Sequence, residues 1–305
     1  MPALICGSLA FDTITTFPGR FAEQILPDQV HILNVSFLVP TLRREWGGCA
    51  GNIAYNLQAL GGQPVIMAAL GVDGGEYIQR IEGWGADTSL IWRDGDLHSA
   101  QCHITTDRDN NQITAFHPGA MSHAHKIAVP PRAKRSDLAI GIIAPDGRDA
   151  MWQHANQMHD AGIPFIFDPG QQLPQFNGEE HRAILGKASW VALNDYEARM
   201  LSERTGESTE AMSHRSNLQG VIVTLAAEGC EVWVKGQRTH VPGVKAADVV
   251  DPTGCGDAFR AGLLYGLESG WTLERSVELA NRIGAIKIAS RGPQNHSLAG
   301  VLDPA

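Results

Sequence analysis

The sequence predicts an α/β fold with a doubly wound, mostly parallel sheet, and three observations support that prediction. From about residue 137 onward, short apolar runs alternate with helix-like segments, as in strands joined by crossover helices. Polar clusters at the ends of such runs contain Asp12, Asp168, Asn194 and Thr224, and open α/β sheets bind ligands at the carboxyl ends of their strands. A chain of 305 residues can form one such domain with a small appendage.

The composition narrows the class of protein. Hydrophobic residues make up 43% and charged residues 19% of the chain, which is typical of a globular protein. A net charge of -9 argues against a general nucleic-acid or membrane-surface binder. The five cysteines include no CxxC pair, and no apolar run reaches the roughly 18 residues of a membrane helix. We therefore expect a cytoplasmic protein without disulfides or structural zinc.

In the N-terminal part, regular elements are separated by two unusual stretches. Residues 17–40 carry aromatic residues and prolines, with strand-like composition at 31–39, which suggests an insertion such as a lid. Residues 98–106 and 112–117 are strand-like and joined by a polar turn, which predicts a hairpin. The remaining elements expected here are strands at 3–6 and 64–70 and helices at 53–60 and 76–84.

The C-terminal half is more regular. Residues 230–235 and 238–241 predict a second hairpin, with Lys235-Gly236-Gln237 at its turn. Helices are expected at 148–161, 257–268 and 272–290, and strands at 138–143, 164–167, 190–193 and 221–224. Repeated strand-then-helix units bring the strand ends to one edge of the sheet, so the polar clusters there should line one crevice.

The stretch Asp251–Phe259, DPTGCGDAF, carries the most chemical information. The β-branched pair Val249-Val250 precedes it and an apolar, helix-like run follows, so a strand-to-helix turn is expected. The first N–H groups of a helix lack partners and, with the helix dipole, bind a phosphate-like anion. Asp257 beside that anion could take a proton from an attacking hydroxyl. The alternative is an ordinary capped helix, which the GxGD residues alone favour.

Two other motifs have similar alternatives. Gly47-Gly48 and Asn52 stand at a helix start, where they could contact a ligand or only allow close packing on a strand. Asn194 and Glu197 begin another helix and could be a cap with a first-turn acid. Phe116, at the end of the first hairpin, could stack on a nucleobase or pack within the lid.

The DPTGCGDAF string resembles the C-terminal signature of the PfkB carbohydrate kinases, the ribokinase-like family. The two glycines followed by Asn52 and a helix resemble its N-terminal signature, and Asn194-x-x-Glu197 resembles its Asn-x-x-Glu motif. The resemblance spans nearly the whole chain. It implies one ribokinase-like domain over residues 1–305, with a small β-rich lid formed by insertions at about 14–45 and 98–118.

The resemblance also implies site residues. Asp257 would be the catalytic base, and the amides of Gly254, Cys255, Gly256 and Asp257 would form the anion hole. The sugar would be held by Asp12, Gly47, Gly48 and Asn52. Magnesium and the ATP phosphates would be held near Asn194 and Glu197, largely through water, and ATP would also contact Thr224, Gly229 and Asn281. Most members have alanine at the position of Cys255, and many have glycine at that of Ala226.

Within the family, the segments near Phe17, His31 and Phe116 look like those of bacterial and archaeal nucleoside kinases, often labelled adenosine kinases. The expected reaction is magnesium-dependent transfer of the γ-phosphoryl group of ATP to the 5′-hydroxyl of a ribonucleoside, with Gln171 and Phe116 as base contacts. A free-sugar kinase for ribose or fructose, and a non-catalytic sensor on the same fold, stay open as alternatives. An oxidoreductase would need a GxGxxG motif after the first strand, which ends in Gly7-Ser8-Leu9-Ala10.

Two further properties stay open in the sequence. Some relatives bind a monovalent cation beside the anion hole, and Asp248 is the candidate ligand for potassium here. The chain could act as a monomer or a homodimer.

Overall fold

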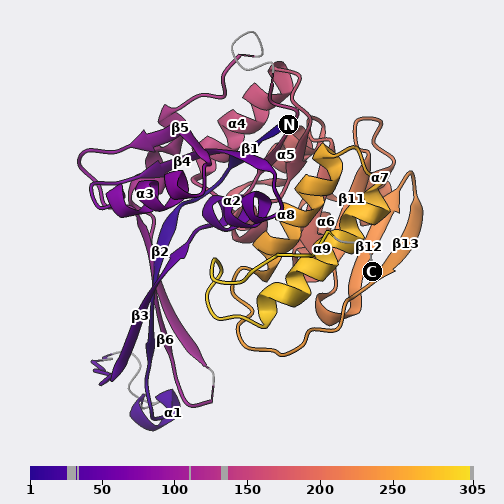
Figure 1. Cartoon of the computed structure of the whole chain (residues 1–305). Helices are drawn as coiled ribbons and strands as arrows, with labels where there is room; N and C mark the ends of the chain where they lie inside the picture. The colour runs from indigo at the N-terminus through magenta and orange to yellow at the C-terminus, as the bar shows by residue number, and fades with distance from the viewer. Residues whose placement is uncertain (26–31, 33, 110, 132–136, 303–305) are drawn as a thin grey trace.

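The chain forms a large sheet covered by helices and a smaller sheet that projects from it (Figure 1). The structure, a computed structural model, describes residues 1–302 apart from 26–31, 33, 110 and 132–136. The large sheet has the order β13-β12-β11-β10-β9-β8-β1-β4-β5. Its strands are parallel from β11 through β5, and β12 and β13 are antiparallel. The predicted mostly parallel sheet is therefore confirmed.

Apart from β5, the strands of the large sheet lie close to their predicted positions in the sequence. Their bounds are β1 (Pro2–Cys6), β4 (Gln63–Leu70), β5 (Asp87–Arg93), β8 (Ile140–Ile143), β9 (Phe165–Phe167), β10 (Trp190–Asn194), β11 (Gly220–Thr224), β12 (Gly229–Val234) and β13 (Gln237–Pro242).

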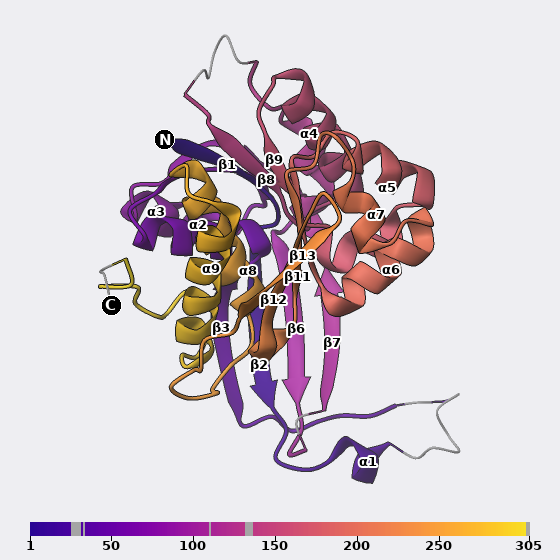
Figure 2. The same ribbon diagram turned by 90° about the vertical axis from the view of Figure 1, so that its right-hand side faces the viewer.

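Helices cover both faces of this sheet (Figure 2). One layer contains α2 (Cys49–Ala59), α3 (Gly75–Gly83), α8 (Cys255–Glu268) and α9 (Leu273–Ile288), and the other contains α4 (Arg148–Asp160), α5 (Gly178–Leu185), α6 (Asp195–Thr205) and α7 (Thr209–Ser213). Side chains alternate between the two layers. In β1, Ile5 packs with the α2 and α8 side, and its neighbours Leu4 and Cys6 pack with the α4 side. Strands buried on both faces explain why the sequence shows continuous apolar runs.

The small sheet has the order β3-β2-β6-β7, with β2 (Ala10–Thr16), β3 (Thr41–Gly47), β6 (Ala100–Thr106) and β7 (Gln112–His117). The predicted hairpin is present as the antiparallel β6-β7 pair, and β2 pairs with β6 in parallel. The short helix α1 (Phe21–Gln24) lies at its far end (Figure 1). The sheet therefore joins two segments that are far apart in sequence, since each residue of β2 pairs with a residue of β6 that lies 90 positions later.

Three local predictions are wrong. The strand-like residues 34–39 are irregular, and the strand follows at β3; residues 31 and 33 of that prediction lie outside the described part of the chain. Val249-Val250 do not form a strand either, because this segment instead docks on the end of α9, where Val250 donates to the carbonyl of Ile288. Asp12, expected just beyond the end of the first strand, lies within a second strand, β2.

Helix α2 begins at Cys49, four residues before the predicted start. Asn52 is therefore inside a helix and faces the interior of the molecule, where it is 4% exposed. Strand β5 was not predicted. Within the described residues, none of the helices has the length and apolar content needed to cross a membrane.

Candidate active site

The turn before α8 presents unpaired amides, as the sequence predicts. Gly254 is the N-cap of α8 and has a φ of 80°, a left-handed conformation that favours glycine. Among the described residues, no acceptor is found for the N–H groups of Gly254, Gly256 and Asp257. The amide of Cys255 is different, because it donates to the carbonyl of Pro252 at 3.1 Å. The predicted set of four free amides is therefore corrected to three.

Asp251 holds this turn in place. One carboxylate oxygen accepts from the amide of Thr253 and the other from the amide of Gly292, both at 2.9 Å. The two hydrogen bonds tie the turn to the segment that follows α9. Asp251 therefore has a structural role: it holds the turn that carries Asp257.

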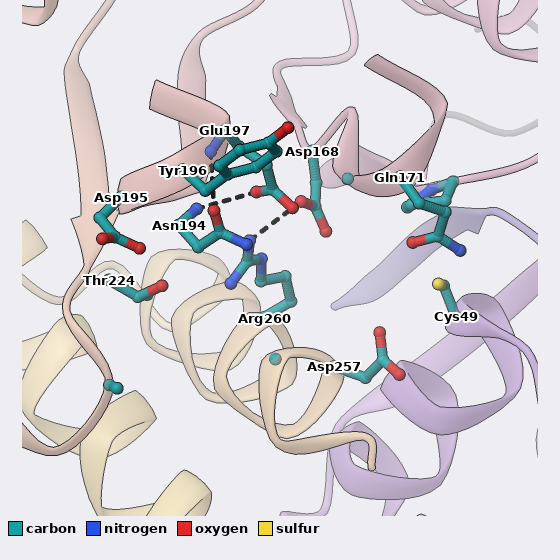
Figure 3. Close-up of a pocket in the computed structure, with 14 residues that line it drawn as sticks. Cys49, Asp168, Gln171, Asn194, Asp195, Tyr196, Glu197, Thr224, Asp257 and Arg260 are labelled. Atoms are coloured by element: carbon teal, nitrogen blue, oxygen red, sulfur yellow. Dashed lines mark hydrogen bonds and ion pairs between the residues drawn. The ribbon is translucent and has the colours of Figure 1, made fainter. Parts of the chain in front are cut away.

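Asp257 points into a pocket of about 440 Å³ at the carboxyl ends of the strands (Figure 3). Asp168, Asn194 and Thr224 line the same pocket, each from the end of a different strand. Three of the four polar strand-end clusters thus meet in one crevice, as parallel topology requires. The pocket is also lined by Cys49, Pro145, Gly170, Gln171, Asp195, Tyr196, Glu197, Ala226, Gly256 and Arg260.

A chain of hydrogen bonds connects Asp257 to Gly47. The amide nitrogen of Asn52 donates to Asp257 Oδ2 at 2.7 Å. Gln294 Nε2 donates to Asn52 Oδ1 at 3.0 Å and to the hydroxyl of Tyr77 at 2.7 Å, and that hydroxyl donates to the carbonyl of Gly47 at 2.7 Å. The two glycine motifs are therefore joined through buried side chains. Sequence reasoning missed Tyr77 and Gln294, which lie outside the motifs that it used.

The electrostatic setting of Asp257 suits a general base. Burial raises its pKa to about 6, the charge of Asp168 adds to the increase, and the hydrogen bond from Asn52 opposes it. A carboxylate with a pKa near 6 is ionised at neutral pH and is more basic than an ordinary aspartate.

Asp12 and the Gly47-Gly48 pair do not line this pocket and lie together where β2 and β3 meet the start of α2. Burial and the charge of Asp257 raise the pKa of Asp12 to about 6, so the two carboxylates affect each other. A Cβ on Gly47 would lie 2.4 Å from Asp12 Oδ2, and one on Gly48 would lie 2.5 Å from the carbonyl oxygen of Ser8. Gly48 also has a φ of 85°. Glycine is therefore required at Gly48 for steric reasons, whereas a larger residue at Gly47 would displace the Asp12 carboxylate.

Asn194 and Glu197 form a capping box at the start of α6. Asn194 Oδ1 accepts from the amide of Glu197 at 2.7 Å, and Glu197 Oε2 accepts from the amide of Asn194 at 2.8 Å. Both residues also line the pocket. Burial, with the charge of Asp168, raises the pKa of Glu197. The capping interpretation thus describes the geometry, and the pocket leaves room for a ligand role.

Arg260 is a pocket residue that sequence reasoning missed. It lies on α8 one turn after Asp257, is 5% exposed, and its Nη2 donates to Asp168 Oδ1 at 3.0 Å. Its Nε is buried and has no partner among the described residues. The signal in the sequence was its spacing: residues three apart on a helix lie on the same face.

Nine predicted site residues lie outside this pocket lining: Gly254, Cys255, Asp12, Gly47, Gly48 and Asn52, which are described above, and Asn281, Gly229 and Phe116. Asn281 donates to the carbonyl of Pro242 at 3.1 Å and accepts from the thiol of Cys230, so it ties α9 to the β12-β13 hairpin. Gly229 has a φ of 100° where β12 begins. Phe116, on β7 of the small sheet, is 49% exposed.

The residues present suit magnesium held mainly by phosphates. Among the described residues, no group of three or more His, Cys, Asp or Glu side chains could bind a metal by itself. Mg²⁺ commonly binds through one or two carboxylates, water and substrate phosphates, and Glu197 and Asp195 at the pocket could serve in that way. Asp248, the candidate potassium ligand, is exposed and caps the amide of Val249.

Comparison with known proteins identifies relatives over nearly the full length of the chain. The family model described as pfkB family carbohydrate kinase matches residues 20–299. The structure of Burkholderia thailandensis nucleoside kinase in complex with inosine is 46% identical, with a TM-score of 0.87 over 98% of this chain and 95% of that one.

A second structure of the same enzyme, in complex with ADP-inosine, is 48% identical, with a TM-score of 0.84 over 98% of this chain and 93% of the other. A nucleoside kinase of Methanocaldococcus jannaschii is 27% identical over 267 residues, covering 86% of this chain and 85% of its own length. With the family model and the matching motifs together, the chain belongs to the pfkB family of carbohydrate kinases.

Proposed function

We propose that this protein is an ATP-dependent nucleoside kinase that phosphorylates the 5′-hydroxyl of a ribonucleoside. The observation that carries the proposal is the position of Asp257. Asp257 and Gly256 line the same pocket, and the amides of Gly254, Gly256 and Asp257 have no acceptor among the described residues. A base and a set of anion donors at one point suit transfer of a phosphoryl group to an alcohol.

The proposed reaction assigns each part of the site a role. Asp257 accepts the proton of the attacking hydroxyl, and the free amides of the turn stabilise charge on the transferring group. Asn52 fixes the orientation of the Asp257 carboxylate through the 2.7 Å hydrogen bond. We place the sugar beside Asp12, Gly47 and Gly48, because a chain of hydrogen bonds links Gly47 to Asp257. Holding the hydroxyl in line with the phosphoryl group supplies much of the rate enhancement.

The nucleotide belongs on the Asn194 side of the pocket. The polar ends of β10 and β11 lie there, together with Glu197 and Arg260. Arg260 provides a buried positive charge next to the phosphates. Bound magnesium would neutralise phosphate charge during transfer, and Glu197 would hold it through water.

The small sheet is proposed as the lid over the sugar. Phe116 is exposed on β7, and an exposed aromatic side chain on a lid can stack on a nucleobase when the lid closes. Gln171, which lines the pocket, is the proposed polar contact to the base. Closure would exclude water and limit wasteful hydrolysis of ATP.

A substrate panel tests the proposal. Adenosine, inosine, guanosine, cytidine, ribose and fructose are each incubated with ATP and magnesium, and release of ADP is measured. We expect at least one ribonucleoside to exceed both free sugars in kcat/KM. Faster turnover of ribose or fructose would indicate a free-sugar kinase, and no turnover with any compound would indicate a sensor that binds without catalysis.

We further propose that the enzyme works in the cytoplasm. The five cysteines include no CxxC pair, which is typical of proteins from a reducing compartment. The homodimer stays a prediction.

A further inference from the structure

A buried lysine lies directly behind the catalytic turn. Lys287 belongs to the last turn of α9 and is fully buried, with an exposed fraction of 0%. Its ammonium group donates to the backbone carbonyl of Asp251 at 2.8 Å and to that of Ser290 at 3.0 Å. The sequence analysis assigned this residue no role. Burying a charged lysine is costly unless the charge is compensated, so its presence here calls for a reason.

The surroundings of the ammonium group are those of a cation site made of carbonyl groups. Among the described residues, no carboxylate oxygen lies within 4.0 Å of Lys287 Nζ, so the ammonium group forms no ion pair there. The group is instead held by two neutral carbonyl oxygens at the negative end of the α9 dipole. Backbone carbonyls in a ring or cluster are the ligands by which proteins bind potassium. A lysine ammonium has the same charge as potassium and makes the same contacts.

The position of Lys287 connects this charge to the anion site. Asp251, whose carbonyl it binds, begins the turn that ends at Asp257. The amide of Asp251 donates to the carbonyl of Ile288 at 3.1 Å, and its two carboxylate oxygens accept from Thr253 and Gly292. Removing the ammonium group would break one of the hydrogen bonds that hold Asp251 in place. It would also remove a positive charge located behind the amides that receive the phosphoryl group.

We infer that the ammonium group of Lys287 replaces a monovalent metal ion behind the catalytic turn, so that the enzyme needs no potassium. Lys287 is then a positioning residue, which acts through Asp251 and does not touch the substrate. The inference rests on the proposed kinase function for its kinetic consequences. Its structural part, a cation site filled by a side chain, can be tested without turnover.

The test compares the unmodified protein with Lys287→Met, at constant ionic strength, in the chlorides of potassium, sodium and tetramethylammonium. The kcat of the unmodified protein should differ by less than twofold among the three salts. The kcat of K287M should fall more than tenfold in tetramethylammonium and recover at least fivefold in potassium or methylammonium, with little change in KM for nucleoside. A lysine that only filled space would give a loss that no cation restores.

Lys187→Met is the matched control. Lys187 follows α5, and its ammonium group also donates to a protein oxygen, that of Asn156, but it is remote from the turn in the sequence and does not line the pocket. We expect K187M to keep its kcat and to show no response to the cation.

Thermal melting supplies the readout that is independent of activity. Potassium should raise the melting temperature of K287M by several degrees over tetramethylammonium and leave that of the unmodified protein unchanged. If the unmodified protein phosphorylates no nucleoside, the proposed function fails, and the melting experiment still decides the role of Lys287. A tenfold activation of the unmodified protein by potassium, or a K287M protein indifferent to cations in both assays, would overturn the inference.

A second variant covers the case in which K287M does not fold in any salt. Lys287→Gln keeps two uncharged N–H donors on a side chain that is one bond shorter. It should fold and lose at least fivefold in kcat. A K287Q protein with the full kcat would show that the charge is not needed.

Discussion

Replacing Asp257 by asparagine should abolish turnover and at the same time stabilise the protein. Asparagine has the same shape, and its carbonyl oxygen can still accept the hydrogen bond that Asn52 donates at 2.7 Å. The variant lacks the base, so kcat should fall by a factor on the order of 10² to 10⁴, or about 3 to 5 kcal/mol in activation free energy. Nucleoside binding should persist.

The stability gain follows from the pKa of Asp257. Folding raises this pKa from 3.8 to about 6, and one pKa unit corresponds to about 1.4 kcal/mol. The ionised carboxylate therefore destabilises the folded protein above pH 6 by up to about 3 kcal/mol. Because Asp257 is partly exposed and water screens its charge, we expect a gain of about 1 to 3 kcal/mol in D257N.

The pH dependence gives this prediction its sign. The penalty is complete above the folded pKa of about 6, decreases as the pH falls, and vanishes below 3.8, where both states carry the protonated acid. Melting curves at pH 8 should therefore place D257N above the unmodified protein by about 2 to 5 °C, and the difference should disappear near pH 4.

Asp149→Asn is the control, because Asp149 is also a first-turn aspartate but lies exposed on α4. It should change neither kcat nor the pH dependence of melting. The reasoning is refuted if D257N retains more than a tenth of the kcat, or if it melts below the unmodified protein at pH 8.

Three further predictions concern Gly48, the ion pair between Arg260 and Asp168, and the pH dependence of the rate. In urea unfolding, Gly48→Ala should destabilise the protein by several kcal/mol more than Gly61→Ala. Both glycines have a φ near 85°, but only at Gly48 would a Cβ lie against backbone atoms, at 2.5 Å. Equal losses of stability would contradict this reasoning. Arg260→Met should lower the free energy of unfolding by about 3 to 5 kcal/mol, because it leaves Asp168 buried and unpaired. Adding Asp168→Asn should restore part of this stability in the same assay. Additive effects of the two changes would contradict a stabilising ion pair. In a profile of kcat/KM against pH, the rate should rise with deprotonation near pH 6, the pKa of Asp257; a flat profile from pH 5 to 8 would argue against this base.

The sequence by itself determined the features that depend on local patterns. Continuous apolar runs between helix-like segments fixed the parallel sheet, because strands covered on both faces need apolar side chains at every position. The glycines and aspartates of DPTGCGDAF fixed the catalytic turn, since the conformation of Gly254 and the position of Asp257 at the head of α8 follow from neighbouring residues. The motif residues Asp168, Asn194 and Thr224 met in one pocket because parallel strands end at the same edge.

The tertiary structure alone decided the contacts that support this turn. Asn52 reaches Asp257 across 205 residues, and Gln294 joins Asn52 to Tyr77. Lys287 lies 36 residues from the carbonyl that it binds. Such polar contacts leave no periodic trace in the sequence, because they depend on how helices α2, α8 and α9 pack against one another. The sequence did not predict that Asp12 lies in a strand, for the same reason. Strand β2 is stabilised by its partners β3 and β6, and strand formation depends on such neighbours more than on intrinsic preference.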